Sequence, residues 1–137
     1  MPDAEARTIV VAHDGPVTKL TMVHEPHNLV GPALLNPLLS SMEGAVASGA
    51  RALVVRSGLR HFSAGADLAL FDRRDDGDGE GGVARMDRPA VVLDRLARMA
   101  APIVASVHGV CLGGGFELVL ACDYVVAARS AKIGSVE

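Results

Sequence analysis

The chain has 137 residues, of which 50% are hydrophobic and 21% charged, a balance typical of globular domains rather than of disordered or fibrous proteins. The formal net charge is −3 and the 13 Lys and Arg residues are scattered, which argues against a nucleic-acid or anionic-membrane surface. No apolar run approaches the roughly 20 residues that span a bilayer. We therefore expect one soluble domain whose partners are small molecules or other proteins.

The cysteines and the first residues of the chain bear on its compartment. Cys111 and Cys122 lie among apolar residues and lack the spacing of metal ligands or of a disulfide framework, so we expect small buried thiols without chemistry. Residues 1–7 are polar and acidic and do not resemble a signal peptide. These features favour the reducing cytoplasm.

The first half of the chain predicts a β-hairpin followed by a helix. Residues 8–13 and 17–23 are rich in β-branched side chains, and residues 14–16, Asp-Gly-Pro, form a turn signal between them. Apolar residues then recur at helical spacing over 34–46, until Gly49 ends the pattern. An antiparallel strand pair and an amphipathic helix are expected.

In the rest of the chain, short apolar runs alternate with helical patterns. The predicted strands are 52–56, 103–107 and 123–127, and the predicted helices are 91–100 and 116–121. Such alternation requires crossover connections and a largely parallel sheet with flanking helices. The predicted fold class is therefore α/β, with a mixed sheet because of the first hairpin.

Residues 72–82 form a separate kind of segment. They consist only of Asp, Arg, Glu and Gly, so they have no apolar side chain to bury. We predict a mobile surface loop there.

Two glycine- and alanine-rich turns, at 63–67 and 109–115, are the strongest functional signal. Each follows a predicted strand, and the second opens a predicted helix. Glycine and alanine let a backbone approach a ligand closely, and a helix start offers free N–H groups and the positive end of a dipole. The pattern indicates a backbone site that stabilises an anion, although a triple glycine also suits a phosphate cradle or close helix packing.

The two turns and their flanks resemble the enoyl-CoA hydratase/isomerase family, also called the crotonase family. Residues 61–68, HFSAGADL, resemble its first signature, and residues 102–123 resemble its second. Asn28 and the leucine-rich helix after it are similar to the family's N-terminal region. The resemblance implies a ββα spiral core in a crotonase-like domain over residues 1–137. It covers about the N-terminal half of a family subunit, so we expect a truncated domain that lacks the C-terminal helices.

By this resemblance, the backbone N–H groups of Ala66 and Gly114 would hold the oxyanion of a thioester carbonyl. Glu117 and Glu137 would be the catalytic carboxylates. Coenzyme A would be the substrate carrier, and neither a metal nor another cofactor is implied. The residues expected to bind the CoA portion and the acyl chain are Ala64, Gly65, Ala66, Asp67, Leu68, Ala69, Gly113 and Gly114.

A pair of carboxylates favours syn addition of water to a trans-2-enoyl-CoA, which gives a 3-hydroxyacyl-CoA. Family members that isomerise or cleave often lack one carboxylate, so an isomerase or another acyl-CoA lyase or hydrolase is one alternative. A truncated, non-catalytic module that binds acyl-CoA or a partner subunit is the other. The family also implies a homo-oligomer, a trimer or hexamer, for the full-length subunit.

Several of these residues also have purely structural interpretations. Glu117 could be an acidic residue stabilised in the first turn of a helix, and Asp67 could bind its own backbone. His61 and His108 adjoin the turns, and we expect structural histidines with satisfied hydrogen bonds. Glu137 lies in a motif that departs from the family pattern, so its role stays open.

Overall fold

The computed structural model describes residues 7–68 and 88–135. In chain order it contains β1 (Ile9–Asp14), β2 (Val17–Met22), α2 (Pro32–Ala47), β3 (Ala52–Ser57), α4 (Pro89–Ala97), β4 (Ile103–Val107), β5 (Val110–Leu112), α5 (Gly114–Leu120), β6 (Tyr124–Ala127) and β7 (Lys132–Gly134). The predicted loop at 72–82 lies outside the described residues. Within the described ranges, no helix is both long and apolar enough to cross a membrane.

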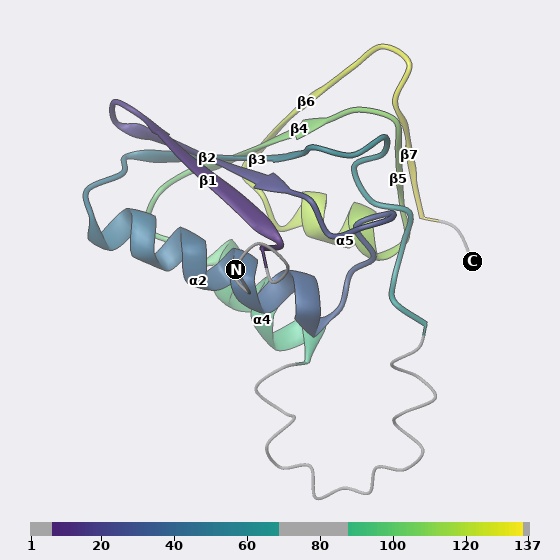
Figure 1. Ribbon diagram of the computed structural model, residues 1–137, viewed down its shortest axis with the longest axis horizontal. Helices are drawn as coiled ribbons and strands as arrows, with labels where there is room; N and C mark the ends of the chain where they lie inside the picture. Colours follow the sequence, from purple (N-terminus) through teal and green to yellow (C-terminus); the bar gives the residue numbers. More distant parts are fainter. Residues whose placement is uncertain (1–6, 69–87, 136–137) are drawn as a thin grey trace, which may run out of the picture.

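Five strands form one mixed sheet in the order β1-β2-β3-β4-β6 (Figure 1). β1 and β2 are antiparallel, with Asp14 opposite Val17, and Gly15 between them has φ 63°, a conformation that glycine adopts without strain. The pairings β2-β3, β3-β4 and β4-β6 are all parallel. The predicted α/β class with an antiparallel start is confirmed.

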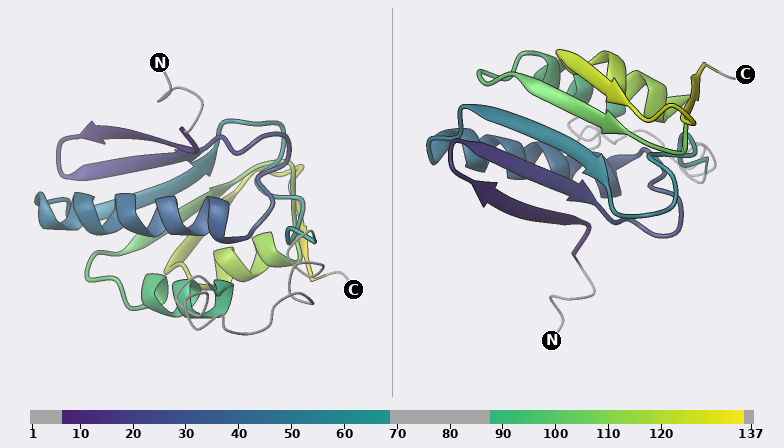
Figure 2. Two further views of the ribbon diagram at one scale, coloured as in Figure 1. Left: turned by 60° about the horizontal axis from the view of Figure 1, so that its bottom comes forward. Right: turned by 90° about the horizontal axis from the view of Figure 1, so that it is seen from above.

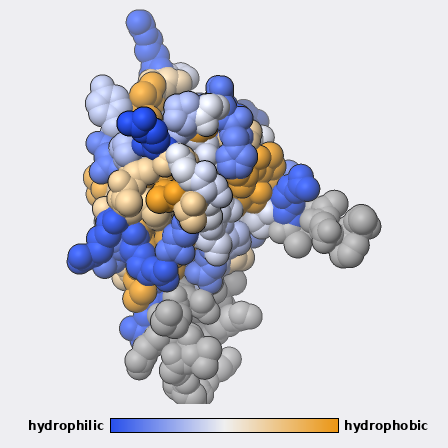
Figure 3. Space-filling view, turned by 90° about the vertical axis from the view of Figure 1, so that its left-hand side faces the viewer, coloured by the Kyte–Doolittle hydropathy of each residue, from blue (hydrophilic) through white to orange (hydrophobic). Residues whose placement is uncertain are grey.

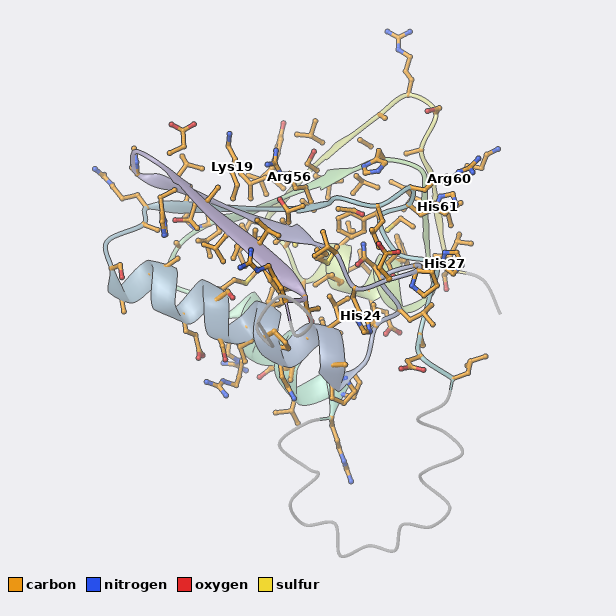
Figure 4. All side chains as sticks on the ribbon, viewed as in Figure 1. Lys19, His24, His27, Arg56, Arg60 and His61 are labelled. Carbon is orange, nitrogen blue, oxygen red and sulfur yellow. The ribbon has the colours of Figure 1, made fainter. Side chains whose placement is uncertain are left out.

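The helices α2, α4 and α5 cover one face of this sheet (Figures 1 and 2). Strand residues alternate between the two faces, and those facing the helices are buried. The buried strand residues of the core are Ile9, Leu20, Met22, Leu53, Val55, Ile103, Ala105 and Val107. On the opposite face, Lys19 and Arg56 point away from the helices (Figure 4), and the Arg56 Nε donates to Thr21 Oγ1 over 2.8 Å.

Helix α2 supplies the largest share of the helical core. Pro32 begins it, where a proline costs little because the first N–H groups of a helix have no intrahelical acceptor. Its apolar residues recur at spacings of three and four and are buried, as the sequence pattern predicted. They are Leu34, Leu35, Leu38, Leu39, Met42 and Ala45.

Several features of the fold differ from the sequence-based expectation. Helices α4 and α5 each begin two residues earlier than predicted, at Pro89 and Gly114. Helix α4 ends at Ala97 rather than at residue 100. Arg98, with φ −100° and ψ 13°, is the C-cap residue, and its N–H donates to Arg95 O. The short strands β5 and β7 were not predicted; they pair in parallel as a separate two-stranded sheet at one end of the molecule (Figure 1).

Candidate functional site

The two glycine- and alanine-rich turns lie side by side. Ser63 pairs with Cys111 in an isolated parallel bridge. The Ser63 N–H donates to Val110 O over 3.1 Å, and the Leu112 N–H donates to Ser63 O over 3.1 Å. The segment that enters the first turn therefore runs parallel to β5, the strand that enters the second.

On its other side, the first turn is held by the chain just before α2. The Val30 N–H donates to Gly65 O over 2.8 Å, and the Asp67 N–H donates to Val30 O over 2.9 Å. In an extended segment successive backbone groups point to opposite sides, so the N–H of Ala66 faces away from Val30. No acceptor among the described residues takes this N–H.

Gly114 packs directly against Ala66. A Cβ added to Gly114 would lie 3.3 Å from the Ala66 N and 3.1 Å from the Val30 Cβ, so a side chain here would crowd the Ala66 N–H. Gly113 has φ 51°, which favours glycine, and a Cβ on it would lie 3.8 Å from the Gly65 Cα. The Gly114 N–H belongs to the first turn of α5 and, within the described part of the chain, also has no acceptor.

Glu117 follows Gly114 by three positions on α5, so the two residues share one face of the helix. Its N–H donates to Gly113 O over 3.0 Å, and its side chain is exposed. Helix α5 has only seven residues, so its start offers individual N–H groups more than the dipole of a long helix. The carboxylate is thus accessible on the helix that begins at the second turn.

The remaining predicted site residues surround the same place or lie outside the described chain. The Ala64 N–H donates to His27 O over 3.0 Å, Asp67 is half-buried, and Leu68 is 67% exposed. Ala69 and Glu137 are not among the described residues. The first turn therefore combines hydrogen-bonded backbone with an accessible apolar side chain.

Asn28 is a buried residue beside the first turn, and no role for its side chain was predicted. Its Nδ2 donates to Ser57 Oγ over 2.9 Å and to Phe62 O over 3.1 Å, and its Oδ1 accepts from the His24 N–H over 2.8 Å. Its carbonyl oxygen accepts from Ser63 Oγ over 2.7 Å. Asn28 therefore fixes the first turn to the loop before α2. Its sequence signals were the resemblance to the family's N-terminal region and its place in a polar loop. Asparagine tolerates positive φ, and the φ of Asn28 is 51°.

Asn28→Ala should lower the free energy of unfolding by about 3 kcal/mol, because buried hydrogen-bonding groups lose their partners and alanine is strained at positive φ. Asn28→Gly removes the same side-chain bonds without the strain, so its loss should be smaller by about 1 kcal/mol. Urea unfolding of the three proteins measures both differences. Wild-type stability in Asn28→Ala would contradict the hydrogen-bonding role.

The two histidines beside the turns have the structural partners that we expected. His61 Nδ1 accepts from the Val110 N–H over 3.0 Å, and His108 Nε2 lies 2.8 Å from Leu59 O. Both rings join the segment after β3 to the segment after β4. The prediction of satisfied histidines is confirmed.

The two cysteines are also consistent with the expectation of unreactive thiols. Cys111 is fully buried, and burial raises the pKa of its thiol to about 11. Burial likewise raises the pKa of the Cys122 thiol to about 12, and the charges of Asp123 and Cys111 add to that effect. Because the thiolate is the nucleophilic form, neither thiol is activated near neutral pH.

A hollow of about 210 Å³ lies far from the two turns. Its lining residues are Val46, Ala50, Arg51, Ala100 and Ala101. They belong to the end of α2 and the segments before β3 and β4, at the left of Figure 1, whereas the turns lie at the right. Figure 3 shows this left-hand face as a mixture of hydrophilic and hydrophobic residues. The hollow is therefore separate from the candidate site.

Comparison with known proteins identifies close similarity over most of the chain. Residues 13–137 match the family model described as enoyl-CoA hydratase/isomerase. A probable enoyl-CoA hydratase of Bacillus subtilis (strain 168) is 33% identical over 127 residues, which are 92% of this chain and 48% of that protein. The human enoyl-CoA hydratase domain-containing protein 2, mitochondrial, is 43% identical over 88 residues, or 64% of this chain and 29% of that protein.

Solved structures of similar proteins superpose well on this chain. A putative enoyl-CoA hydratase/isomerase (crotonase) from Legionella pneumophila superposes with a TM-score of 0.77 at 27% identity, over 90% of this chain and 49% of that chain. An enoyl-CoA hydratase/carnithine racemase from Magnetospirillum magneticum has a TM-score of 0.79 at 22% identity, over 94% and 49%. The chain spans about half the length of the Bacillus relative, 48%. It belongs to the enoyl-CoA hydratase/isomerase (crotonase) family and has the crotonase fold.

Proposed function

We propose that this chain carries the site of an enoyl-CoA hydratase, which adds water to a trans-2-enoyl-CoA and gives a 3-hydroxyacyl-CoA. The observation that carries the proposal is the packing of Gly114 against the Ala66 nitrogen. The two residues adjoin, and no other described residue accepts from the N–H of Ala66 or of Gly114. A thioester carbonyl oxygen placed between them would accept a hydrogen bond from each.

These donors suit the charge that the reaction develops. When the water oxygen bonds to the β-carbon, the π electrons of the double bond move toward the thioester and negative charge collects on the carbonyl oxygen. Fixed N–H groups stabilise that charge without reorganising, and removal of one such donor typically costs about 3 kcal/mol of barrier. The C=O bond re-forms when the α-carbon takes a proton, so the net change is addition of one water.

Glu117 is our candidate for proton transfer at this site. It is exposed and lies one helical turn after Gly114, where a carboxylate can accept a proton from the attacking water. We propose Glu137 as the second carboxylate, which supplies the proton to the α-carbon. A hydrogen bond near this residue supports the proposal: the Gly113 N–H of the second turn donates to Gly134 O over 3.1 Å. Gly134 precedes Glu137 by three positions in the sequence.

The same two turns are our candidates for binding the acyl group and its carrier. We propose that residues 64–69 and Gly113 contact the CoA portion and the acyl chain; the exposed side chain of Leu68 offers apolar surface beside the donors. The addition is redox-neutral overall, so CoA as the substrate carrier is the only cofactor that the proposal requires. A homo-oligomer, as the family implies, is likewise a proposal, which sedimentation equilibrium would test.

The test is hydration of crotonyl-CoA, followed through the ultraviolet absorbance of the conjugated thioester. We expect a decrease that is proportional to protein concentration. A trans-3-enoyl-CoA tests the isomerase alternative, because isomerisation would instead raise that absorbance. No turnover at high protein concentration would contradict the hydratase, and binding heat from an acyl-CoA without turnover would favour a binding module.

A further inference from the structure

We propose that His61 is a positioning residue whose neutral ring sets the spacing of the two donor turns and whose protonation loosens it. Its imidazole connects the segment that enters the first turn to the start of β5, which enters the second. The inference rests on the proposed function, since the spacing of the turns matters through the N–H groups of Ala66 and Gly114.

Hydrogen bonds join the two entering segments just before the turns diverge. The Phe62 N–H donates to His108 O over 3.0 Å, and the Ser63 N–H donates to Val110 O over 3.1 Å. The Val110 N–H donates to His61 Nδ1 over 3.0 Å. The Leu112 N–H also donates to Ser63 O over 3.1 Å, so three of these four bonds use only backbone atoms, whereas the bond to His61 depends on an imidazole side chain. Val110 takes part in two of them, so loss of the His61 bond leaves Val110 held to this segment through its carbonyl oxygen alone.

The two histidine rings respond differently to acid. Leu59 O can only accept, so His108 Nε2, 2.8 Å away, carries a hydrogen and donates it. That bond survives protonation because both ring nitrogens of an imidazolium are donors. His61 Nδ1 instead accepts from the Val110 N–H, so it must keep its lone pair. Protonation would place two donors against each other and break only the His61 bond.

The backbone at Gly109 lies against the ring of His61. Gly109, with φ 68°, lets the backbone approach the ring: a Cβ there would lie 2.8 Å from His61 Nδ1 and 2.6 Å from Arg60 O. On this side, a protonated ring that repels the Val110 N–H would press on neighbouring backbone. The displacement passes into β5, and Gly114 follows Val110 by four positions.

Other titratable groups lie close to His61 and must be separated from it by experiment. The ring of His27, from the loop before α2, has its centroid 6.5 Å away at an interplanar angle of 44°. Arg60 precedes His61 in the chain, and Figure 4 shows Arg60, His61 and His27 at the same end of the molecule. His108 approaches from the end of β4, and Cys111 follows Val110 in β5. Of these, His27 provides the matched control.

Amide chemical shifts of the ¹⁵N-labelled chain test the proposal without substrate. In wild type, acidification from about pH 8 to 5, where imidazoles change charge, should move the Val110 amide resonance. The Ala66 and Gly114 amides should move with the same midpoint. His61→Asn should abolish this shared titration, because the asparagine oxygen can accept from Val110 N–H but does not titrate. His27→Asn should keep it.

Kinetics supply the second measurement. If wild type hydrates crotonyl-CoA, its kcat should fall as the pH is lowered, with the same midpoint as the amide resonances. His61→Asn should not show this fall in kcat. His61→Leu, which cannot accept, should lower kcat about tenfold at neutral pH, with KM little changed, because misplaced donors lose transition-state binding. Inactive wild type would contradict the proposed function but leave the amide test intact.

Three results would overturn the positioning role. The first is a Val110 amide that does not titrate in wild type. The second is a Val110 titration that the Ala66 and Gly114 amides do not follow. The third is a shared titration that persists in His61→Asn or disappears in His27→Asn.

Discussion

Glu117→Gln should lower kcat for crotonyl-CoA hydration by about two to four orders of magnitude, the usual contribution of a general acid or base. Glutamine has the same shape but cannot accept the proton of the attacking water. Glu117 is exposed, and in the described part of the chain its carboxylate makes no hydrogen bond or ion pair. The substitution should therefore leave the free energy of unfolding almost unchanged. The hydration assay measures the loss of kcat, and urea unfolding measures stability separately.

Glu43→Gln is the matched control for this prediction. Glu43 is an exposed carboxylate on α2 that pairs with Arg95 over 2.6 Å, and the proposed chemistry does not use it. An exposed pair of this kind contributes under about 1 kcal/mol, so both kcat and stability should stay near wild type. Equal rates for Glu117→Gln and wild type would remove Glu117 from the mechanism.

Gly115→Ala should destabilise the chain by about 3 kcal/mol and abolish acyl-CoA binding. A Cβ at position 115 would lie 2.6 Å from the Ser63 Cβ, 2.8 Å from Ser63 Oγ and 3.1 Å from Ser63 O. Ser63 cannot retreat easily, because it is fully buried and its hydroxyl donates to Asn28 O over 2.7 Å. The clash would push the two turns apart. Urea unfolding measures the stability, and isothermal titration with an acyl-CoA measures the binding.

Gly44→Ala makes the same chemical change where the fold has room. Gly44 is an exposed residue in α2, and nothing lies within 4 Å of a Cβ built on it. Alanine should raise the free energy of unfolding by about 0.5–1 kcal/mol, because it favours the helix more than glycine does. If Gly115→Ala were as stable as Gly44→Ala, the close contact of the two turns would be refuted.

The parts of the fold that follow local patterns were predictable. The hairpin at β1 and β2 has β-branched strands around an Asp-Gly turn, and α2 has leucines at helical spacing. The strand at 103–107 was predicted with the bounds that the structure has. β5 and β7 have three residues each, too few for a period to show, and they exist because distant segments pair. Their pairing is non-local information that no short window contains.

The site was predictable in a similarly uneven way. Resemblance to the crotonase signatures selected Ala66, Gly114 and Glu117, and the structure brings the first two together on backbone contacts. The resemblance did not predict the buried hydrogen bonds of Asn28 or the contact between Gly115 and Ser63. Those contacts depend on distances between segments that only the fold determines, so the sequence predicts candidate donors but not the contacts that hold them.

The central claim, that the Ala66 and Gly114 amides bind a thioester carbonyl, can be tested most directly by NMR of the ¹⁵N-labelled chain. The measurement compares spectra with butyryl-CoA and with free CoA, which share every group except the acyl thioester. The proposal predicts that butyryl-CoA shifts both amide protons downfield and that free CoA does not, because only the thioester has the carbonyl that accepts from them. Unchanged resonances with butyryl-CoA at saturation, or equal shifts with both ligands, would contradict it.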